Sequence, residues 1–235
     1  MVSRRTAVWL IGGVMAWSVT VSPAMVWAQK ESVNPGINDT FRDPDVNDFV
    51  KKFEIESREI YAHRDQILKA CELKSGDRVA DIGAGTGLYT RLFAKAVGEQ
   101  GHVTAVDIAP KFLDHIQLTC REAGLKNVDA VLCTADSVGL PESSIDVAFI
   151  CDTYHHFEFP TKTMQSLHKA LKPGGRVVVI DFRRIPGQSR EWVMNHVRAG
   201  QDVVEAEITA CGFRKASEQS DLLTENYLVV FEKVD

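Results

Sequence analysis

The stretch VADIGAGTGLYT, residues 79–90, decides the fold of this chain. An apolar run ends on an acid, Asp81, and is followed by Gly83, Gly85 and Gly87. A short apolar run bounded by turn residues is typical of a buried strand. Because glycine has no side chain, a turn rich in it lets backbone N–H groups approach a ligand closely. The stretch therefore predicts a strand, a ligand-contacting turn and the start of a helix.

Strand and helix patterns alternate through the rest of the chain. The predicted strands lie at residues 78–82, 103–106, 128–133, 145–151, 177–181 and 227–231, separated by helical patterns near 88–98, 112–124, 164–171, 189–197 and 202–211. Several of these strands are nearly continuous apolar runs, which are buried on both faces in a parallel sheet between helix layers. The sequence predicts an α/β fold with a doubly wound, mostly parallel sheet.

The chain before the first strand has a different character. Residues 29–45 are irregular, and the apolar spacing over 45–73 predicts a helical segment. We divide the chain into a signal peptide at 1–28, a leader with a helical cap at 29–72, and a ligand-binding domain at 73–235.

The extreme N-terminus has the layout of a secretory signal peptide. Arg4 and Arg5 precede a stretch without charge from Thr6 to Gln29, and Val26 and Ala28 stand at the −3 and −1 positions of a cleavage site before Gln29. This pattern predicts export to the periplasm or outside the cell. The uncharged run at 6–29 is also long enough to span a bilayer, so an uncleaved membrane anchor remains the alternative. Contact with a membrane is expected only through this segment, and only if it stays uncleaved.

Composition narrows the classes of partner. The chain has 235 residues, 45% of them apolar and 25% charged, and a formal net charge of −5. Without clustered Lys and Arg to neutralise phosphates, no nucleic-acid partner is expected. The five cysteines are odd in number and form no CxxC pair, which indicates neither a disulfide framework nor a zinc site. Nothing in the sequence indicates an oligomeric state.

The second strand ends on an acid suited to a nucleoside. Asp107 lies 20 residues past Gly87, where a carboxylate can accept both ribose hydroxyls. A dinucleotide-binding turn would have Gly or Ala at position 88, which is Leu88 here. Asp81, just before the turn, would also repel a pyrophosphate. These features favour S-adenosylmethionine, which carries a sulfonium, an ammonium and a carboxylate, over a nicotinamide cofactor.

Four blocks in order resemble the class I S-adenosylmethionine-dependent methyltransferases, of the type found in quinone biosynthesis and related small-molecule enzymes. They are Asp81-Ile-Gly-Ala-Gly-Thr-Gly87, Asp107, Thr134-Ala-Asp136-Ser137 with the following Leu140-Pro141, and Leu171-Lys-Pro-Gly-Gly175. The resemblance implies a Rossmann-like fold and S-adenosylmethionine as cofactor. It implies a cofactor site formed by Asp81, Gly83, Gly85, Gly87, Asp107, Ile108, Asp136 and Ser137, with Asp107 on the ribose and Asp136 on the adenine amino group.

The loop after the fourth strand is the expected reacting end. In the resembling family the matching segment, here Cys151-Asp-Thr-Tyr-His-His-Phe157, passes beside the donor methyl. A hydroxyl or amine acceptor must lose a proton, and a histidine suits that task. We take His155 and His156 as candidate bases, Asp152 as their orienting group and Tyr154 as a wall of the acceptor pocket. In the alternative interpretation the loop only shapes the pocket.

The predicted function is methyl transfer to a small-molecule acceptor. The alternative is a non-catalytic exported protein that keeps a methyltransferase-like cofactor-binding fold. A metal held by Asp152, His155, His156 and Asp181 is compatible with composition, but the spacing matches no established pattern, so no metal is expected. The remaining histidines, His196 among them, are interpreted as surface or helix-packing residues.

Overall fold

The computed structural model describes residues 29–234. The predicted signal peptide, residues 1–28, lies outside the described residues. Within the described part, none of the helices combines the length and apolar character that a membrane crossing needs.

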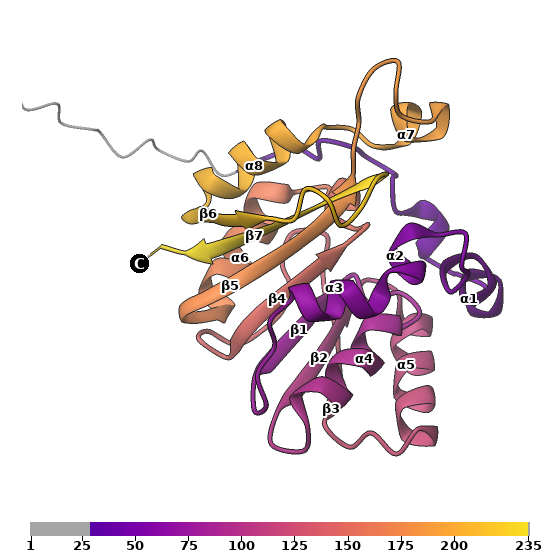
Figure 1. The fold of residues 1–235 in the computed structure, drawn as a ribbon, viewed down its shortest axis with the longest axis vertical. Helices are drawn as coiled ribbons and strands as arrows, with labels where there is room; N and C mark the ends of the chain where they lie inside the picture. The colour runs from indigo at the N-terminus through magenta and orange to yellow at the C-terminus, as the bar shows by residue number, and fades with distance from the viewer. Residues whose placement is uncertain (1–28, 235) are drawn as a thin grey trace, which may run out of the picture.

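The described chain is built on a seven-stranded sheet in the order β3-β2-β1-β4-β5-β7-β6 (Figure 1). The strands are β1 (Arg78–Ile82), β2 (His102–Asp107), β3 (Val128–Leu132), β4 (Ile145–Cys151), β5 (Leu171–Phe182), β6 (Phe213–Glu218) and β7 (Asn226–Lys233). Strands β1 to β5 pair in parallel, and β7 pairs antiparallel with β5 and β6. The predicted doubly wound, mostly parallel sheet is confirmed.

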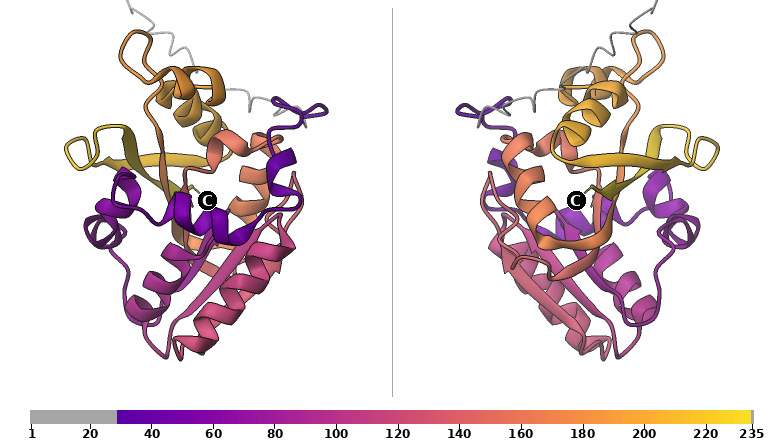
Figure 2. Two further views of the ribbon diagram at one scale, coloured as in Figure 1. Left: turned by 90° about the vertical axis from the view of Figure 1, so that its right-hand side faces the viewer. Right: turned by 90° about the vertical axis from the view of Figure 1, so that its left-hand side faces the viewer.

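Helices cover both faces of the sheet (Figure 2). On one face lie α3 (Arg64–Ala70), α4 (Leu88–Val97) and α5 (Pro110–Glu122), and on the other lie α6 (Pro160–Ala170) and α8 (Gln201–Ala210). Phe93 of α4 and Leu167 of α6 are fully buried in the two opposite layers. Burying a side chain of this kind stabilises a fold by roughly 1.5–3 kcal/mol. These contacts fix the strands whose ends carry the site.

The predicted helical segment over 45–73 is broken into three helices. They are α1 (Val46–Phe53), α2 (Glu59–Ala62) and α3, and the short η1 (Asp39–Phe41) precedes them. No residue of α1 is buried. The chain turns between α1 and α2 because Glu54 pairs with Arg91 of α4, while Arg58 reaches back to the loop after β4. The break places both ends of the cap beside the carboxyl edge of the sheet.

Strand β6 was not predicted. Its residues, FRKASE, are mostly polar and mostly exposed, so they show no alternating apolar pattern. Edge strands are commonly charged because charge discourages pairing with other chains. In the structure β6 forms the outer edge of the sheet next to β7.

The strand order reverses between β1 and β4. In open parallel sheets the ligand site lies beyond the carboxyl ends of the strands at this switch point. The ends of β1, β2, β4 and β5 meet there, and two further elements reach the same edge: the short η2 (Tyr154–His156) and α7 (Glu191–His196).

Candidate cofactor and acceptor site

A cavity of about 520 Å³ lies at the switch point. Its wall combines the glycine turn, the end of β2, the loop after β4, aromatic side chains of the cap, and α7. Of the residues singled out in the sequence, the wall contains Asp81, Gly83, Gly85, Asp107, Ile108, Ser137, Asp152, His155 and His156. Gly87 and Asp136 are not among its lining residues.

Two of the three turn glycines are required by protein packing. A Cβ on Gly83 would lie 2.2 Å from Thr153 Cγ2, and one on Gly87 would lie 2.6 Å from Ile116 Cγ1. Gly85 differs, since a Cβ there would meet nothing closer than the Phe53 ring at 3.7 Å. All three have positive φ, which disfavours other residues. Gly83 and Gly85 both line the cavity, and of the three glycines only Gly85 has open space where a Cβ would stand.

Asp107 is fixed in position by the backbone around it. Its Oδ2 accepts the Gly85 N–H and its Oδ1 accepts the Ala109 N–H, each at 2.9 Å. Burial raises the pKa of Asp107, and the hydrogen bonds from Gly85 and Ala109 partly offset that effect. Each carboxylate oxygen keeps a free lone pair. The side chain can thus accept two further hydroxyl protons, as the paired hydroxyls of a ribose require.

Asp81 supplies a second buried carboxyl group. Its Oδ2 accepts the Thr90 hydroxyl at 2.6 Å, and only 4% of the residue is exposed. Burial raises the pKa of Asp81 to about 6. The hydrogen bond from Thr90 opposes this rise, and the negative charge of the nearby Asp107 adds to it. A cationic ligand at the turn would favour the ionised form of this group.

Asp136 lies at the rim. Its carboxylate accepts the Thr134 hydroxyl at 2.9 Å and the Lys162 ammonium at 3.3 Å. These contacts lower the pKa of Asp136. The adjacent Ser137 does line the cavity. The adenine role of Asp136 stays a prediction.

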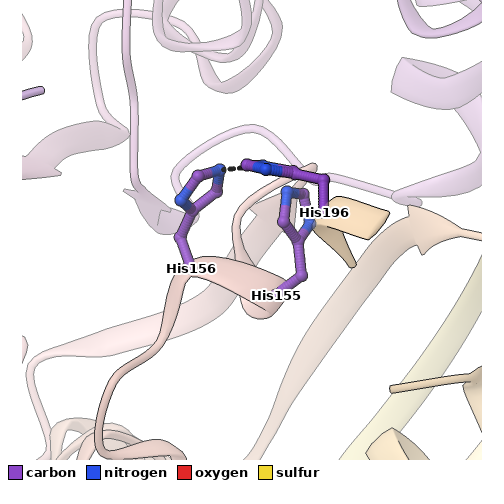
Figure 3. A group of neighbouring side chains, drawn as sticks. All are labelled: His155, His156 and His196. Atoms are coloured by element: carbon purple, nitrogen blue, oxygen red, sulfur yellow. Dashed lines mark hydrogen bonds between the residues drawn. The ribbon is translucent and has the colours of Figure 1, made fainter. Parts of the chain in front are cut away.

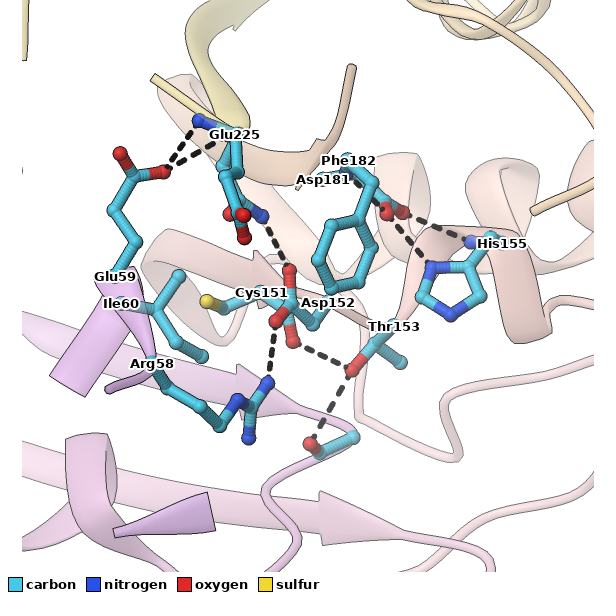
Figure 4. A network of polar contacts seen from close by, with 12 residues as sticks. Arg58, Glu59, Ile60, Cys151, Asp152, Thr153, His155, Asp181, Phe182 and Glu225 are labelled. Carbon is cyan, nitrogen blue, oxygen red and sulfur yellow. Dashed lines mark hydrogen bonds and ion pairs between the residues drawn. The ribbon is translucent and has the colours of Figure 1, made fainter. Parts of the chain in front are cut away.

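The sequence analysis expected Asp152 to orient a histidine, but its carboxylate contacts other residues. Its Oδ2 accepts Arg58 Nη2 at 2.5 Å and its Oδ1 accepts Asn226 Nδ2 at 2.6 Å (Figure 4). Burial raises the pKa of Asp152 to about 6, although the positive charge of Arg58 opposes the shift. Asp152 instead joins the cap to β7, and Arg58 is a cavity residue that the sequence analysis missed.

The partner of His155 is Asp181, at the end of β5. The His155 Nδ1 and Asp181 Oδ1 atoms are 2.7 Å apart, and the His155 backbone N–H donates to Asp181 Oδ2 at 3.0 Å (Figure 4). Burial lowers the pKa of His155, but the charge and hydrogen bond of Asp181 outweigh it, so the net shift is upward. Asp181 thus fixes the ring orientation of His155.

Helix α7 brings a third imidazole to the site. His196 Nε2 lies 3.4 Å from His156 Nε2, and the His196 ring stacks on Trp192 with centroids 4.6 Å apart. Burial lowers the pKa of His156 to about 2, and the charges of His155 and His196 add to this. His196 does pack within its helix, as the sequence predicted, but that interpretation missed that it also lines the cavity. Its spacing of four from Trp192, on one helix face, was the available signal.

Tyr154 was expected to line the acceptor pocket, and that expectation was also wrong. The side chain is fully buried in the core below the loop, where its hydroxyl donates to Glu207 Oε2 at 3.0 Å. A large aromatic ring next to an apolar layer gains more by burial there than at the cavity wall.

Comparisons with known proteins identify the domain. Residues 79–175 match the family model described as a methyltransferase domain. The Vibrio vulnificus protein named ubiquinone/menaquinone biosynthesis C-methyltransferase UbiE is 34% identical over 112 residues, which cover 47% of this chain and 43% of that protein. The Yersinia enterocolitica protein of the same name is 33% identical over 113 residues, covering 48% and 45%. The chain thus matches less than half the length of these relatives.

Solved structures share the fold. A SAM-dependent methyltransferase from Aquifex aeolicus superposes with a TM-score of 0.72 at 24% identity, covering 81% of this chain and all of that one. Residues 79–175 thus resemble a methyltransferase domain, and the described chain has the fold of the class I S-adenosylmethionine-dependent methyltransferases. S-adenosylmethionine is the cofactor of this class.

The residues of this methyltransferase domain fit the cofactor. Asp107 offers two acceptor oxygens, and Gly83 and Gly85 line the cavity. Asp81 offers negative charge beside them. Asp107 matches the paired hydroxyls of a ribose and Asp81 matches an ammonium, whereas the N–H groups of Gly83 and Gly85 already donate to Val106 O and Asp107 Oδ2.

Proposed function

We propose that the chain transfers a methyl group from S-adenosylmethionine to a small-molecule acceptor. The observation that carries this proposal is the continuity of the cavity: one space is lined both by the turn with Asp107 and by the imidazoles of η2 and α7. A donor held at the first end would direct its methyl toward an acceptor at the second. Such alignment is the main catalytic contribution in an in-line displacement.

The acceptor end favours a flat, largely apolar molecule. Phe182 and Trp192 line the cavity with ring centroids 5.4 Å apart, and Phe41 packs edge-on against His156 at 5.1 Å. The printed name of the relatives refers to ubiquinone and menaquinone biosynthesis. Aromatic hydroxyl compounds and quinols are therefore the first class of acceptor to test. His155 and His156 are proposed to contact the acceptor there.

The reaction is tested with donor labelled on its methyl group. The full chain is incubated with labelled S-adenosylmethionine and a panel of phenols, quinols, amines and thiols, and label in an extracted product is measured. Transfer to at least one acceptor is expected. Donor binding without transfer to any aromatic, amine or thiol acceptor would contradict the proposal and favour a non-catalytic binding protein.

Donor binding is predicted to depend on Asp107. Replacing it in Asp107→Ala removes the two acceptor oxygens and leaves the Gly85 N–H without its partner. We expect affinity for S-adenosylmethionine to fall by at least roughly 100-fold, because two charge-assisted hydrogen bonds are lost. Isothermal titration calorimetry measures it. The control is Asp129→Asn on β3, whose side chain is 74% exposed and pairs with His102; equal affinities of the two variants would refute the assignment.

We also propose, from the sequence pattern alone, that the protein is exported. N-terminal sequencing of the protein from fractionated cells tests this. A first residue at position 29 in the exported fraction is the expected result, and an intact N-terminus in the soluble cell interior would contradict it.

A further inference from the structure

Three imidazole rings converge at the acceptor end of the cavity (Figure 3). His155 and His156 come from η2 and His196 from α7, and one ring nitrogen of each lies within 4.8 Å of the other two. The closest pair, the Nε2 atoms of His156 and His196, is 3.4 Å apart. A tetrahedral ion with metal–nitrogen bonds of about 2.0–2.1 Å holds two ligand nitrogens roughly 3.4 Å apart. We propose that His155, His156 and His196 bind a divalent transition-metal ion.

The second contact of His155 has the arrangement typical of a metal site. Histidines that bind metals typically donate the other ring N–H to a carboxylate or the backbone. His155 engages Asp181 through Nδ1 at 2.7 Å, which leaves Nε2 as its ligand atom. His156 has its Nδ1 buried without a hydrogen bond of ordinary geometry, beside the backbone of Ile37. Its Nε2 is likewise the atom that faces His196.

The close approach of two of the rings also suits an ion. A ligand imidazole binds through an unprotonated nitrogen, and His156 and His196 hold their Nε2 atoms 3.4 Å apart. Without an ion, the Nε2 atoms of His156 and His196 can share only one proton, and the Nε2 atom of His155 forms no hydrogen bond with either of them. An ion in place of that proton satisfies all three rings.

The ligand set also indicates the class of ion. Imidazole nitrogen suits Zn²⁺, Fe²⁺, Co²⁺, Ni²⁺ and Cu²⁺, whereas Mg²⁺ and Ca²⁺ prefer oxygen. Three protein ligands leave a position open, as in catalytic zinc sites. All three histidines line the cavity, so that position faces the acceptor. This differs from the four-residue set considered from the sequence, because Asp152 binds Arg58 and Asp181 supports His155.

The proposal of a metal site and the proposal of methyl transfer can be disproved independently of each other. The site stands on the imidazole geometry alone. If both hold, the ion polarises an acceptor oxygen and lowers its pKa, and His155 serves as a ligand and not as a base.

Metal titration of the full chain, purified with an affinity tag free of histidine, tests the site. Co²⁺ is added after chelator treatment and the visible absorption of the bound ion is followed; Zn²⁺ affinity is then measured by competition with a chromophoric chelator. We expect one ion per chain. His196→Ala is expected to weaken binding by at least about 100-fold, more than the loss of a supporting contact alone.

Matched controls separate this site from adventitious binding and from donor binding. His115→Gln changes a histidine on α5 outside the cavity wall and is expected to leave metal affinity unchanged. Asp107→Ala is expected to lose donor binding and keep the metal, whereas His196→Ala keeps the donor. No bound Co²⁺ in the wild type, or equal affinity in His196→Ala, would overturn the proposal.

Discussion

At the scale of single residues, the site is governed by two buried carboxyl groups beside a glycine turn. Asp81 and Asp107 are 4% and 6% exposed, and burial raises the pKa of both. Such an arrangement costs free energy in the empty protein unless a proton or a cation neutralises the charge. A ligand with a sulfonium and an ammonium supplies that charge. The pair therefore links cofactor binding to pH.

Donor affinity is predicted to rise between pH 5 and pH 7. The pKa of Asp81 in the folded chain is about 6, above the ordinary value of 3.8. The protonated form is thus stabilised by folding, and this contribution to stability is present below about pH 4 and lost as pH rises through about 6. The donor binds the ionised form, so its affinity should increase about tenfold over this interval.

Calorimetry at the two pH values measures this change. In Asp81→Asn the affinity should be lower and nearly independent of pH. Asp152→Asn is the matched control, because the pKa of Asp152 is also about 6 but its carboxylate is held by Arg58. If the pH dependence of donor affinity survives in Asp81→Asn and disappears in Asp152→Asn, the titrating group is Asp152 and the assignment to Asp81 is wrong.

The sequence predicted those site residues that stand in a recognisable local pattern. Asp81, Asp107 and His155 each follow or end an apolar strand, and the ends of parallel strands meet at one edge. Partners were harder to assign. Asp181 lies 26 residues from His155 and His196 lies 40 residues from His156, so only the folded chain shows which acid orients which ring.

At the scale of elements, the cap is held to the domain through short helices and their ends. Glu59, at the start of α2, accepts the backbone N–H groups of Glu225 and Asn226 at 2.9 Å each, and that of Thr224. One carboxylate therefore fixes the connection between β6 and β7 against the cap (Figure 4). The break in the predicted helix over 45–73 follows from such contacts. They join residues distant in sequence, so the apolar spacing of this segment could not predict them.

Removing this carboxylate is predicted to destabilise the protein. Glu59→Ala leaves three backbone donors without their partner, and we expect a loss of about 1–3 kcal/mol in the free energy of unfolding. Urea unfolding measures the change. Glu56→Ala is the control, because Glu56 is 71% exposed and pairs with Arg64 at the surface; its effect should be within about 0.5 kcal/mol. Equal losses in the two variants would show that the contacts of Glu59 add nothing.

At the scale of the whole molecule, the cavity is closed by parts far apart in sequence. Phe49, Phe53 and Arg58 of the cap line it together with the strand ends. Arg58 is also the link, since Asp152 binds both it and Asn226 of β7. The sheet could be predicted because its apolar runs are local signals. The closure could not, because its contacts join residues far apart in sequence, such as the partly buried ion pair of Arg58 and Asp152 across 94 residues.

Breaking this pair is predicted to loosen the cap over the cavity. In Arg58→Met the buried Asp152 loses its countercharge, which raises the pKa of Asp152 further and destabilises the fold by about 1–3 kcal/mol, less than a fully buried pair because Arg58 is 24% exposed. Hydrogen exchange over residues 46–62 should quicken, and donor affinity should fall with it. The double variant Arg58→Met/Asp152→Asn removes the uncompensated charge, so it should recover most of the stability while exchange in the cap stays fast. Slow exchange in both variants would mean that the aromatic contacts of the cap close the cavity without this ion pair.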